Sequence, residues 1–282
     1  MDSEQQGVDR LRRLWDFTDL DATQGRLRAT LREETSVSGR AEVLTQLARI
    51  EGLHSRIDEA NRLLGEAEAL AGAIPVARVR VLLERGRVLR LSGDLDAALP
   101  LFEEAFEAAL AAGQDFIAGD AAHMAALSGD MLAWTERGLD VANGSPAAAY
   151  WIGTLKNNLG WWHAQRGEHT ESLAAYRGSL EAYEQNARYP YLREVARVGV
   201  ARALRNLGRT KEALPLLEQA VAWAQAAGHA DRAFHDELAA AYADLGRTDE
   251  AADQERLSAL AGPRQFALWQ SRPRPPRSDP GS

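Results

Sequence analysis

Four segments of this chain repeat one pattern of residues, and this repetition restricts its possible folds more than any other feature. Each segment begins with a glycine and a short polar run; the glycines are Gly93, Gly167, Gly208 and Gly246. A small, a larger and a second small residue follow at spacings of four and three, as in Ala98, Phe102 and Ala105. Residues at these spacings share one face of a helix. Because Gly208 lies 41 positions after Gly167, and Gly246 lies 38 positions after Gly208, the period predicts a stacked array of helical units.

An apolar, helix-periodic stretch comes before each of these turn glycines. A small residue lies seven positions before each turn; the four are Gly86, Gly160, Ala201 and Ala239. Glycine inside a helix costs about 1 kcal/mol relative to alanine, so its use at the same phase in two units needs a compensating reason. We therefore expect another helix backbone to approach closely at Gly86 and Gly160.

This pattern resembles the tetratricopeptide repeat, a helix-turn-helix unit. Leu159, Gly160 and Gly167 match the first helix and turn of the family signature. Ala98 and Phe102 match its second helix. The resemblance implies an all-α fold, a right-handed α-α superhelix (solenoid) of about six helical hairpins with an N-terminal helical cap. Because the glycine interval exceeds the family's usual repeat of about 34 residues, we expect extended helices or loops.

The sequence divides into three regions. Residues 1–40 are expected to form the cap, with helices around 8–16 and 23–34, because a stack of repeats needs an end with one polar face. The solenoid is expected to span 41–262. Its approximate repeats are 41–74, 79–111, 112–145, 153–186, 194–227 and 232–262. Residues 263–282 are rich in Pro and Arg, which predicts a disordered tail.

The composition argues against several classes of function. The net charge of −8 disfavours nucleic acids and anionic membranes as partners. The chain contains no cysteine, which excludes disulfides and thiolate metal sites. Its start shows no apolar region typical of a secretory signal, and no run of about 18 apolar residues is present to span a membrane. We therefore expect a cytoplasmic protein.

No sequence motif for catalysis, metal binding or cofactor binding is present. The chain lacks a Gly-rich phosphate loop and the HExxH and GxSxG patterns. Its histidines are dispersed, and His163 falls at a packing position. His235, Asp236 and Glu237 are consecutive, so they point in different directions around a helix. We expect no catalytic residues, no metal site and no cofactor.

The resemblance implies that the first helix of each repeat lines the inside of a concave groove. Transferring the family's groove positions to this chain gives one set of candidate ligand-binding residues: Arg49, Glu84, Arg87, Arg90, Asp120, His123, Asn157, Asn158, Trp161, Arg202, Arg205 and Asn206. Gln46, Asp236 and Glu237 fall at equivalent positions. Asn158 also matches one position of the family's carboxylate clamp, but the clamp lysines are not matched.

The chemistry of these candidates predicts a peptide ligand. Arginine suits carboxylates and phosphates, and a concave wall strengthens its field, so the arginines favour an acidic ligand. An asparagine amide both donates to and accepts from a peptide backbone, and Trp161 offers an apolar anchor. A second interpretation stays open, because the solvated inner face of a solenoid needs polar residues whether or not it binds a ligand.

We therefore expect a non-catalytic scaffold that binds a protein or peptide segment in its concave groove. The alternative is a regulatory sensor that binds a signal peptide or small molecule. Because no DNA-binding domain or nucleotide-binding loop is recognised, such a sensor has to act through a partner protein. An enzyme built on the repeat scaffold is a third interpretation, with no motif in its favour.

Overall fold

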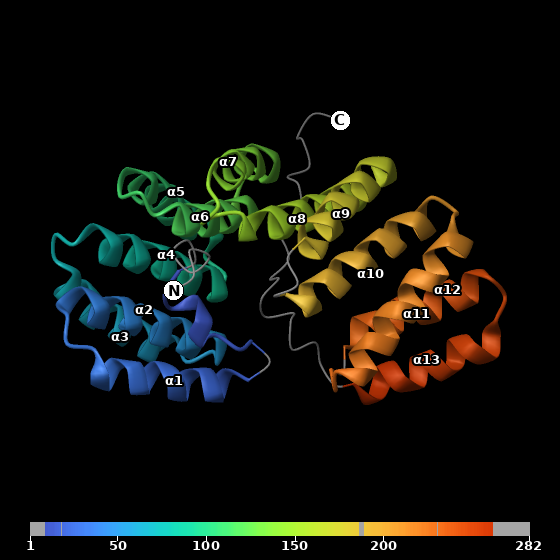
Figure 1. Ribbon diagram of the computed structural model, residues 1–282, viewed down its shortest axis with the longest axis horizontal. Helices are drawn as coiled ribbons and strands as arrows, with labels where there is room; N and C mark the ends of the chain where they lie inside the picture. Colours follow the sequence, from blue (N-terminus) through green and yellow to red (C-terminus); the bar gives the residue numbers. More distant parts are fainter. Residues whose placement is uncertain (1–8, 18, 186–188, 230, 262–282) are drawn as a thin grey trace. The chain divides into compact units, whose positions relative to one another are not determined.

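The computed structural model of the chain describes residues 9–17, 19–185, 189–229 and 231–261, and in these ranges the regular elements are helices (Figure 1). A short 3₁₀ helix, η2, comes first (Arg12–Leu14). The α-helices are α1 (Leu20–Glu33), α2 (Val37–Leu53), α3 (Ile57–Ala71), α4 (Pro75–Leu91), α5 (Leu95–Ala111), α6 (Asp115–Ser128), α7 (Met131–Gly144), α8 (Tyr150–Gln165), α9 (His169–Glu184), α10 (Pro190–Asn206), α11 (Thr210–Ala226), α12 (Arg232–Asp244) and α13 (Thr248–Leu260). The expected all-α fold is confirmed.

The helices pack as consecutive hairpins in two compact units. Of the described residues, 9–151 belong to unit 1 and 152–261 to unit 2. In unit 1 the hairpins are α2 with α3, α4 with α5, and α6 with α7. In unit 2, α10 pairs with α11 and α12 with α13. The first helices also stack on one another, α2 on α4, α4 on α6, and α10 on α12, which gives each unit a surface built from successive first helices.

The turns between paired helices depend on glycine in the left-handed backbone region. The turn glycines identified from the sequence all have positive φ: Gly93 (90°), Gly167 (73°), Gly208 (72°) and Gly246 (73°). Residues with a Cβ rarely adopt this conformation. After Gly93 a side chain also caps the next helix: Asp94 accepts from the backbone N–H of Ala97 at 3.0 Å. The helices that follow Gly167, Gly208 and Gly246 start without a side-chain cap.

Glycines inside the first helices lie against aromatic rings of the second helices. A Cβ added to Gly86 would come within 2.5 Å of the Phe102 ring. One added to Gly160 would meet the Tyr176 ring at 2.8 Å, and one on Gly199 would meet the same ring at 2.4 Å. The sequence predicted a close approach here, but by a helix backbone. The neighbour is an aromatic side chain, and the missing Cβ makes room for it.

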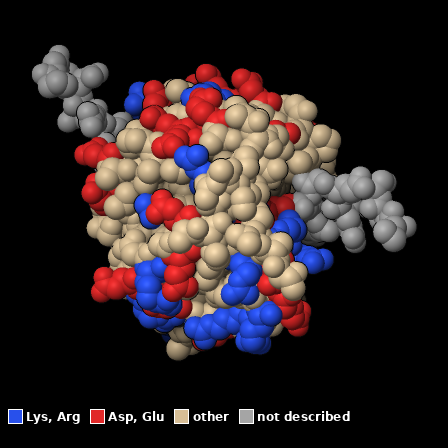
Figure 2. Space-filling model, turned by 90° about the vertical axis from the view of Figure 1, so that its left-hand side faces the viewer, with Lys and Arg blue, Asp and Glu red and all other residues tan. Residues whose placement is uncertain are grey.

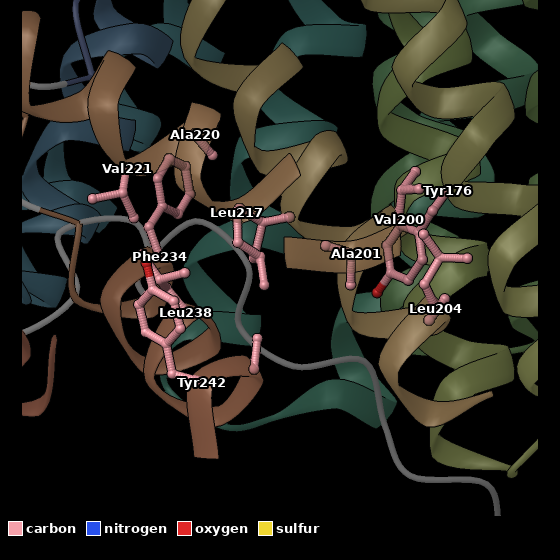
Figure 3. Packing of buried hydrophobic residues seen from close by; sticks show 14 of the residues in the cluster. Tyr176, Val200, Ala201, Leu204, Leu217, Ala220, Val221, Phe234, Leu238 and Tyr242 are labelled. Carbon is pink, nitrogen blue, oxygen red and sulfur yellow. The ribbon is translucent and has the colours of Figure 1, made fainter. Parts of the chain in front are cut away.

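Each unit has its own apolar core between the helix layers. In unit 2 (Figure 3), Tyr176, Leu204, Leu217 and Phe234 lie in a cluster that joins α9 to α12. In unit 1, the cluster runs from α1 to α4 and also takes in Leu11, whose side chain is buried beside these helices. No helix among the described residues is long and apolar enough to cross a membrane.

The N-terminal region differs from the expected pair of helices. The first expected helix, around residues 8–16, is only the single turn of η2. The second, around 23–34, begins earlier, at Leu20, where the side chain of Asp19 accepts from the N–H of Ala22 at 2.8 Å. Side chains around this turn contact α2, α4 and α8. The tail expected at residues 263–282 lies outside the described residues.

Exposed charges are unevenly distributed over unit 1. Exposed arginines lie on α1 (Arg26, Arg28 and Arg32), and exposed glutamates lie on α5 (Glu103, Glu104 and Glu107). Figure 2 views this side of the molecule, with basic residues gathered toward the lower edge and acidic residues toward the upper edge. The buried arginines described next do not contribute to this surface.

Candidate binding faces on the first helices

Half of the predicted ligand-binding residues meet on one surface of unit 1. We call this surface the unit 1 face; its residues are Gln46, Arg49, Glu84, Arg87, Arg90, Asp120 and His123, from α2, α4 and α6. Arg49 lies 3.7 Å from Glu84 and 3.8 Å from Asp120. Arg87 pairs with Glu84 at 3.1 Å and also with Asp120. The residues that helical phase placed on one surface therefore do lie together, but most of them are buried and pair with one another.

The unit 1 face carries more positive than negative charge. Burial and the charge of Arg87 lower the pKa of Arg49 to about 10. The same two causes lower the pKa of Arg90 to about 10. Burial also acts to lower the pKa of Arg87, but the charges of Asp120 and Glu84 outweigh burial, so the pKa of Arg87 is raised. All three arginines therefore stay charged near neutral pH, opposite two carboxylates.

His123 is a neutral member of this cluster. Burial, which outweighs the attraction of Asp120, lowers the pKa of His123 to about 3. Its ring stacks on Trp151, with centroids 5.5 Å apart and planes 26° apart. The indole N–H of Trp151 in turn donates to the carbonyl of Phe116 at 2.8 Å. His123 therefore acts as a packing residue near pH 7, and a ligand-binding role would need this stack to open.

A segment of the chain itself lies on the unit 1 face. We call residues 9–17 the N-terminal segment. The indole N–H of Trp15 donates to the side-chain oxygen of Gln46 at 3.0 Å, and the Arg49 guanidinium lies 5.0 Å from the centre of the Trp15 ring. Asp9 forms an ion pair with Arg80 of α4. The sequence did not predict this contact, although two aromatic residues in a short polar segment are a signal that it binds a surface.

The remaining predicted residues lie in unit 2. We call the surface formed by α8, α10 and α12 the unit 2 face; its residues are Asn157, Asn158, Trp161, Arg202, Arg205, Asn206 and Glu237. Asn158 is buried, Asn157 and Trp161 are half-buried, and Asn206 is exposed. These side chains therefore keep more contact with solvent than those of the unit 1 face.

Glu237 joins the arginines of the unit 2 face. It accepts from Arg202 at 2.6 Å and from Arg205 at 2.9 Å. Arg205 also contacts Asp244 at 2.9 Å. Burial acts against the charge of Arg202, but Glu237 and Tyr176 outweigh it and raise its pKa. Since 32% of the Arg202 side chain is exposed, an external carboxylate can reach it beside Glu237.

Two other histidines contact polar side chains. His163 contacts Glu168 at 2.7 Å, and His235 contacts Gln254 at 2.8 Å. Within the part of the chain that the structure describes, no group of three or more His, Cys, Asp or Glu side chains is arranged to hold a metal ion.

Stacked helical hairpins define an all-α repeat protein, and comparison with known families specifies the repeat. Residues 162–266 match the family model described as tetratrico peptide repeat. Together with the stacked hairpins, this match shows a tetratricopeptide-like repeat fold. A comparison with curated proteins finds no significant match.

Similar solved structures share this fold at low sequence identity. One is a STAND signal-transduction ATPase with a tetratricopeptide-repeat sensor from Pyrococcus horikoshii, at a TM-score of 0.65 and 12% identity, covering 86% of this chain and 39% of that one. The present chain therefore spans about two fifths of that protein. A Rap protein complexed with competence and sporulation factor has a TM-score of 0.56 and 14% identity, and the match covers 92% of this chain and 74% of that one. The apo quorum sensor NprR from B. thuringiensis has a TM-score of 0.52 and 13% identity, and the match covers 89% of this chain and 85% of that one.

Proposed function

We propose that this chain is a non-catalytic, cytoplasmic scaffold that binds a peptide or protein segment through the unit 2 face. One observation carries the proposal: Asn157 and Trp161 of α8 and Arg202 of α10 keep part of their surface accessible. The net charge of −8 makes a nucleic acid an unfavourable partner. A fold built of repeats has extended surfaces of this kind that bind other chains.

The unit 2 face favours a ligand that carries a carboxylate and an apolar side chain. Arg202 and Arg205 both bind Glu237, so a ligand carboxylate would share the two guanidinium groups with it. Forked N–H donors of arginine suit this exchange. Asn157 supplies an amide that donates and accepts, and Trp161 supplies a ring against which an apolar side chain can pack.

The test starts from selection of peptides on the immobilised full chain with a random display library. The affinity of a selected peptide is then measured for the wild type and for an Arg202→Ala and Arg205→Ala double variant. We expect about tenfold weaker binding and a loss of salt dependence, because charge-assisted hydrogen bonds are removed.

Arg209→Ala is the matched control. Arg209 pairs with Glu212 near the start of α11, so its loss removes one arginine while leaving the unit 2 face intact. Affinity equal to that of the wild type is expected for this control. Selected peptides that bind the double variant as tightly as the wild type would reject the assignment of the unit 2 face.

The second candidate function is a regulatory sensor acting through a partner. It is favoured by the N-terminal segment on the unit 1 face, because a docked segment can move when a ligand binds. It is also favoured by the likeness to the Rap protein and the NprR quorum sensor. Small-angle scattering of the full chain with a saturating selected peptide tests it; an unchanged profile contradicts a sensor that works by a large rearrangement.

A further inference from the structure

The N-terminal segment contacts α2 and α4, on the unit 1 face and next to it, through three kinds of side chain. A carboxylate binds a buried arginine, in the ion pair between Asp9 and Arg80. An indole binds a polar amide, with Trp15 donating to Gln46 at 3.0 Å. An arginine of the segment binds a carboxylate of α2, with Arg10 lying 3.1 Å from Glu42. These are the interactions by which an extended peptide is recognised.

Two of its partners, Gln46 and Arg49, are residues that the repeat pattern places at groove positions. Gln46 and Arg49 were placed at groove positions from helical phase alone, without reference to residues 9–17. Arg49 lies 5.0 Å from the centre of the Trp15 ring and 5.9 Å from that of Phe17, and these two rings stack on each other at 4.8 Å. The chain thus places its own aromatic residues where the family fold would take those of a ligand.

A contact from the middle of the segment reaches the first residue of α8. Arg12 donates to the hydroxyl of Tyr150 at 3.3 Å, and its guanidinium lies 5.2 Å from the centre of that ring. Tyr150 is 138 positions away in sequence. The segment therefore contacts residues of unit 1 that are far apart in the chain.

The segment is held mainly by groups that another peptide can replace. Only Leu11 inserts fully into the apolar core of unit 1, while Arg10, Arg13 and Asp16 are exposed. Loss of Asp9 would leave Arg80 buried with Glu42 as its remaining carboxylate, at 3.0 Å. Leaving a buried charge short of partners is unfavourable. A carboxylate of another peptide should therefore be able to replace Asp9, and an aromatic ring of that peptide should be able to replace Trp15.

From these contacts we propose that the unit 1 face is a second peptide-binding site, occupied in the free protein by the N-terminal segment. Its external ligand is a peptide that presents a carboxylate to Arg80 and an aromatic ring to Gln46 and Arg49. The spacing is that of Asp9 and Trp15 in the chain itself. Because this surface is separate from the unit 2 face, failure here leaves the proposed function of unit 2 in place.

The test measures binding of a fluorescein-labelled peptide with the sequence of residues 9–17, DRLRRLWDF, to the full chain. Its receptors are the wild type and an Asp9→Asn and Trp15→Ala double variant, in which the chain's own segment is weakened. The variant should bind the peptide about tenfold more tightly than the wild type, since self-occupation reduces apparent affinity by the fraction of open sites. The same peptide carrying Asn and Ala at those two positions should not bind.

Two controls separate this result from a general effect. Arg13 is exposed, so Arg13→Ala should leave the peptide affinity at the wild-type value. Gln46→Ala, added to the double variant, should weaken the peptide again because the indole N–H loses its acceptor. Equal affinity of the peptide for wild type and double variant would overturn the proposal.

A second measurement avoids any dependence on the folding of the double variant. Since the chain has no cysteine, Arg13→Cys gives a single attachment site for a fluorescent dye in an otherwise unchanged chain. Excess unlabelled peptide should release the segment and lower the anisotropy of the dye. Anisotropy that stays constant at saturating peptide would show that the segment is a fixed part of unit 1.

Discussion

The two faces are built from equivalent helices of one repeat, yet they differ in how their charges are used. On the unit 1 face, Arg49, Arg87 and Asp120 are largely buried and bind one another, and Arg49 also contacts Trp15 of the N-terminal segment. On the unit 2 face, Arg202 and Arg205 share Glu237 and remain partly exposed. The same helical phase therefore produces an interior ion network in one unit and an accessible polar surface in the other. The helices of unit 1 differ in having the N-terminal segment packed against them.

The largest loss of stability that the comparison predicts is for substitution of Asp120. Asp120→Asn would leave Arg49, Arg87 and Arg90 with Glu84 as the one carboxylate of the unit 1 face. Breaking a buried ion pair by removing one partner costs about 3–5 kcal/mol. Urea unfolding should show this loss, and hydrogen exchange followed by mass spectrometry should locate it in α2, α4 and α6. A cost below about 1 kcal/mol would mean that solvent reaches the network.

The second largest effect on stability is expected on acidification, through His123 of unit 1. The pKa of His123 falls from 6.5 to about 3 on folding, so below pH 6.5 the unfolded chain binds a proton that the folded chain does not. Stability is therefore fully present above pH 6.5 and decreases as the pH falls toward 3. The expected loss is about 3 kcal/mol near pH 4.

The comparison variant for acidification is His123→Gln, which has no titratable ring. Because protonation of Asp120 and other carboxylates also destabilises the fold in acid, only the difference between the two chains reports on His123. Free energies of unfolding measured from pH 7 to pH 4 should fall less steeply for this variant. Parallel curves would show that His123 takes up its proton in the folded state.

Packing at the internal glycines should affect both units alike. Gly86→Ala and Gly199→Ala would each drive a Cβ into an aromatic ring, at 2.5 Å from Phe102 and 2.4 Å from Tyr176. Overpacking of this kind costs about 1–3 kcal/mol. Gly65→Ala in α3, with nothing within 4 Å of the added Cβ, should instead stabilise by about 0.5–1 kcal/mol. Thermal unfolding with opposite shifts in melting temperature would confirm the contrast.

The smallest effect on stability is expected at Glu237. Glu237→Gln removes the carboxylate shared by Arg202 and Arg205, but these groups retain contact with water, so the cost should be about 1 kcal/mol or less. The same substitution should strengthen binding of a selected acidic peptide to the unit 2 face, because the arginines lose their internal competitor. Weaker binding of that peptide, measured by fluorescence anisotropy, would place Glu237 itself in contact with the ligand.

Much of the fold follows from the sequence because repeats make local signals consistent. The glycines at 93, 167, 208 and 246 lie at turns with positive φ, and the small residue at Gly86 faces the larger one at Phe102. Such contacts lie within one hairpin, where helical phase decides which residues meet. The sequence was less informative about Gly199, which touches Tyr176 from the following hairpin.

The candidate sites were harder to predict because exposure depends on segments remote in sequence. Phase placed Gln46 and Arg49 on the first helices, but it gave no indication that the chain would fold residues 9–17 against them. The contact of Asp9 with Arg80 crosses 71 positions. Phase also does not reveal that the partner of Arg202 is Glu237, which lies 35 positions further along the chain.

Tyr176 has a consequence for how such a protein can grow. Its ring rests on Gly160 within its own hairpin and on Gly199 in the next one, so one side chain sets the spacing in both directions. A copied hairpin inserted here would fit only if it brought its own aromatic residue and met a glycine on either side. Lengthening of the array by gene duplication is therefore restricted to whole units cut at matching points.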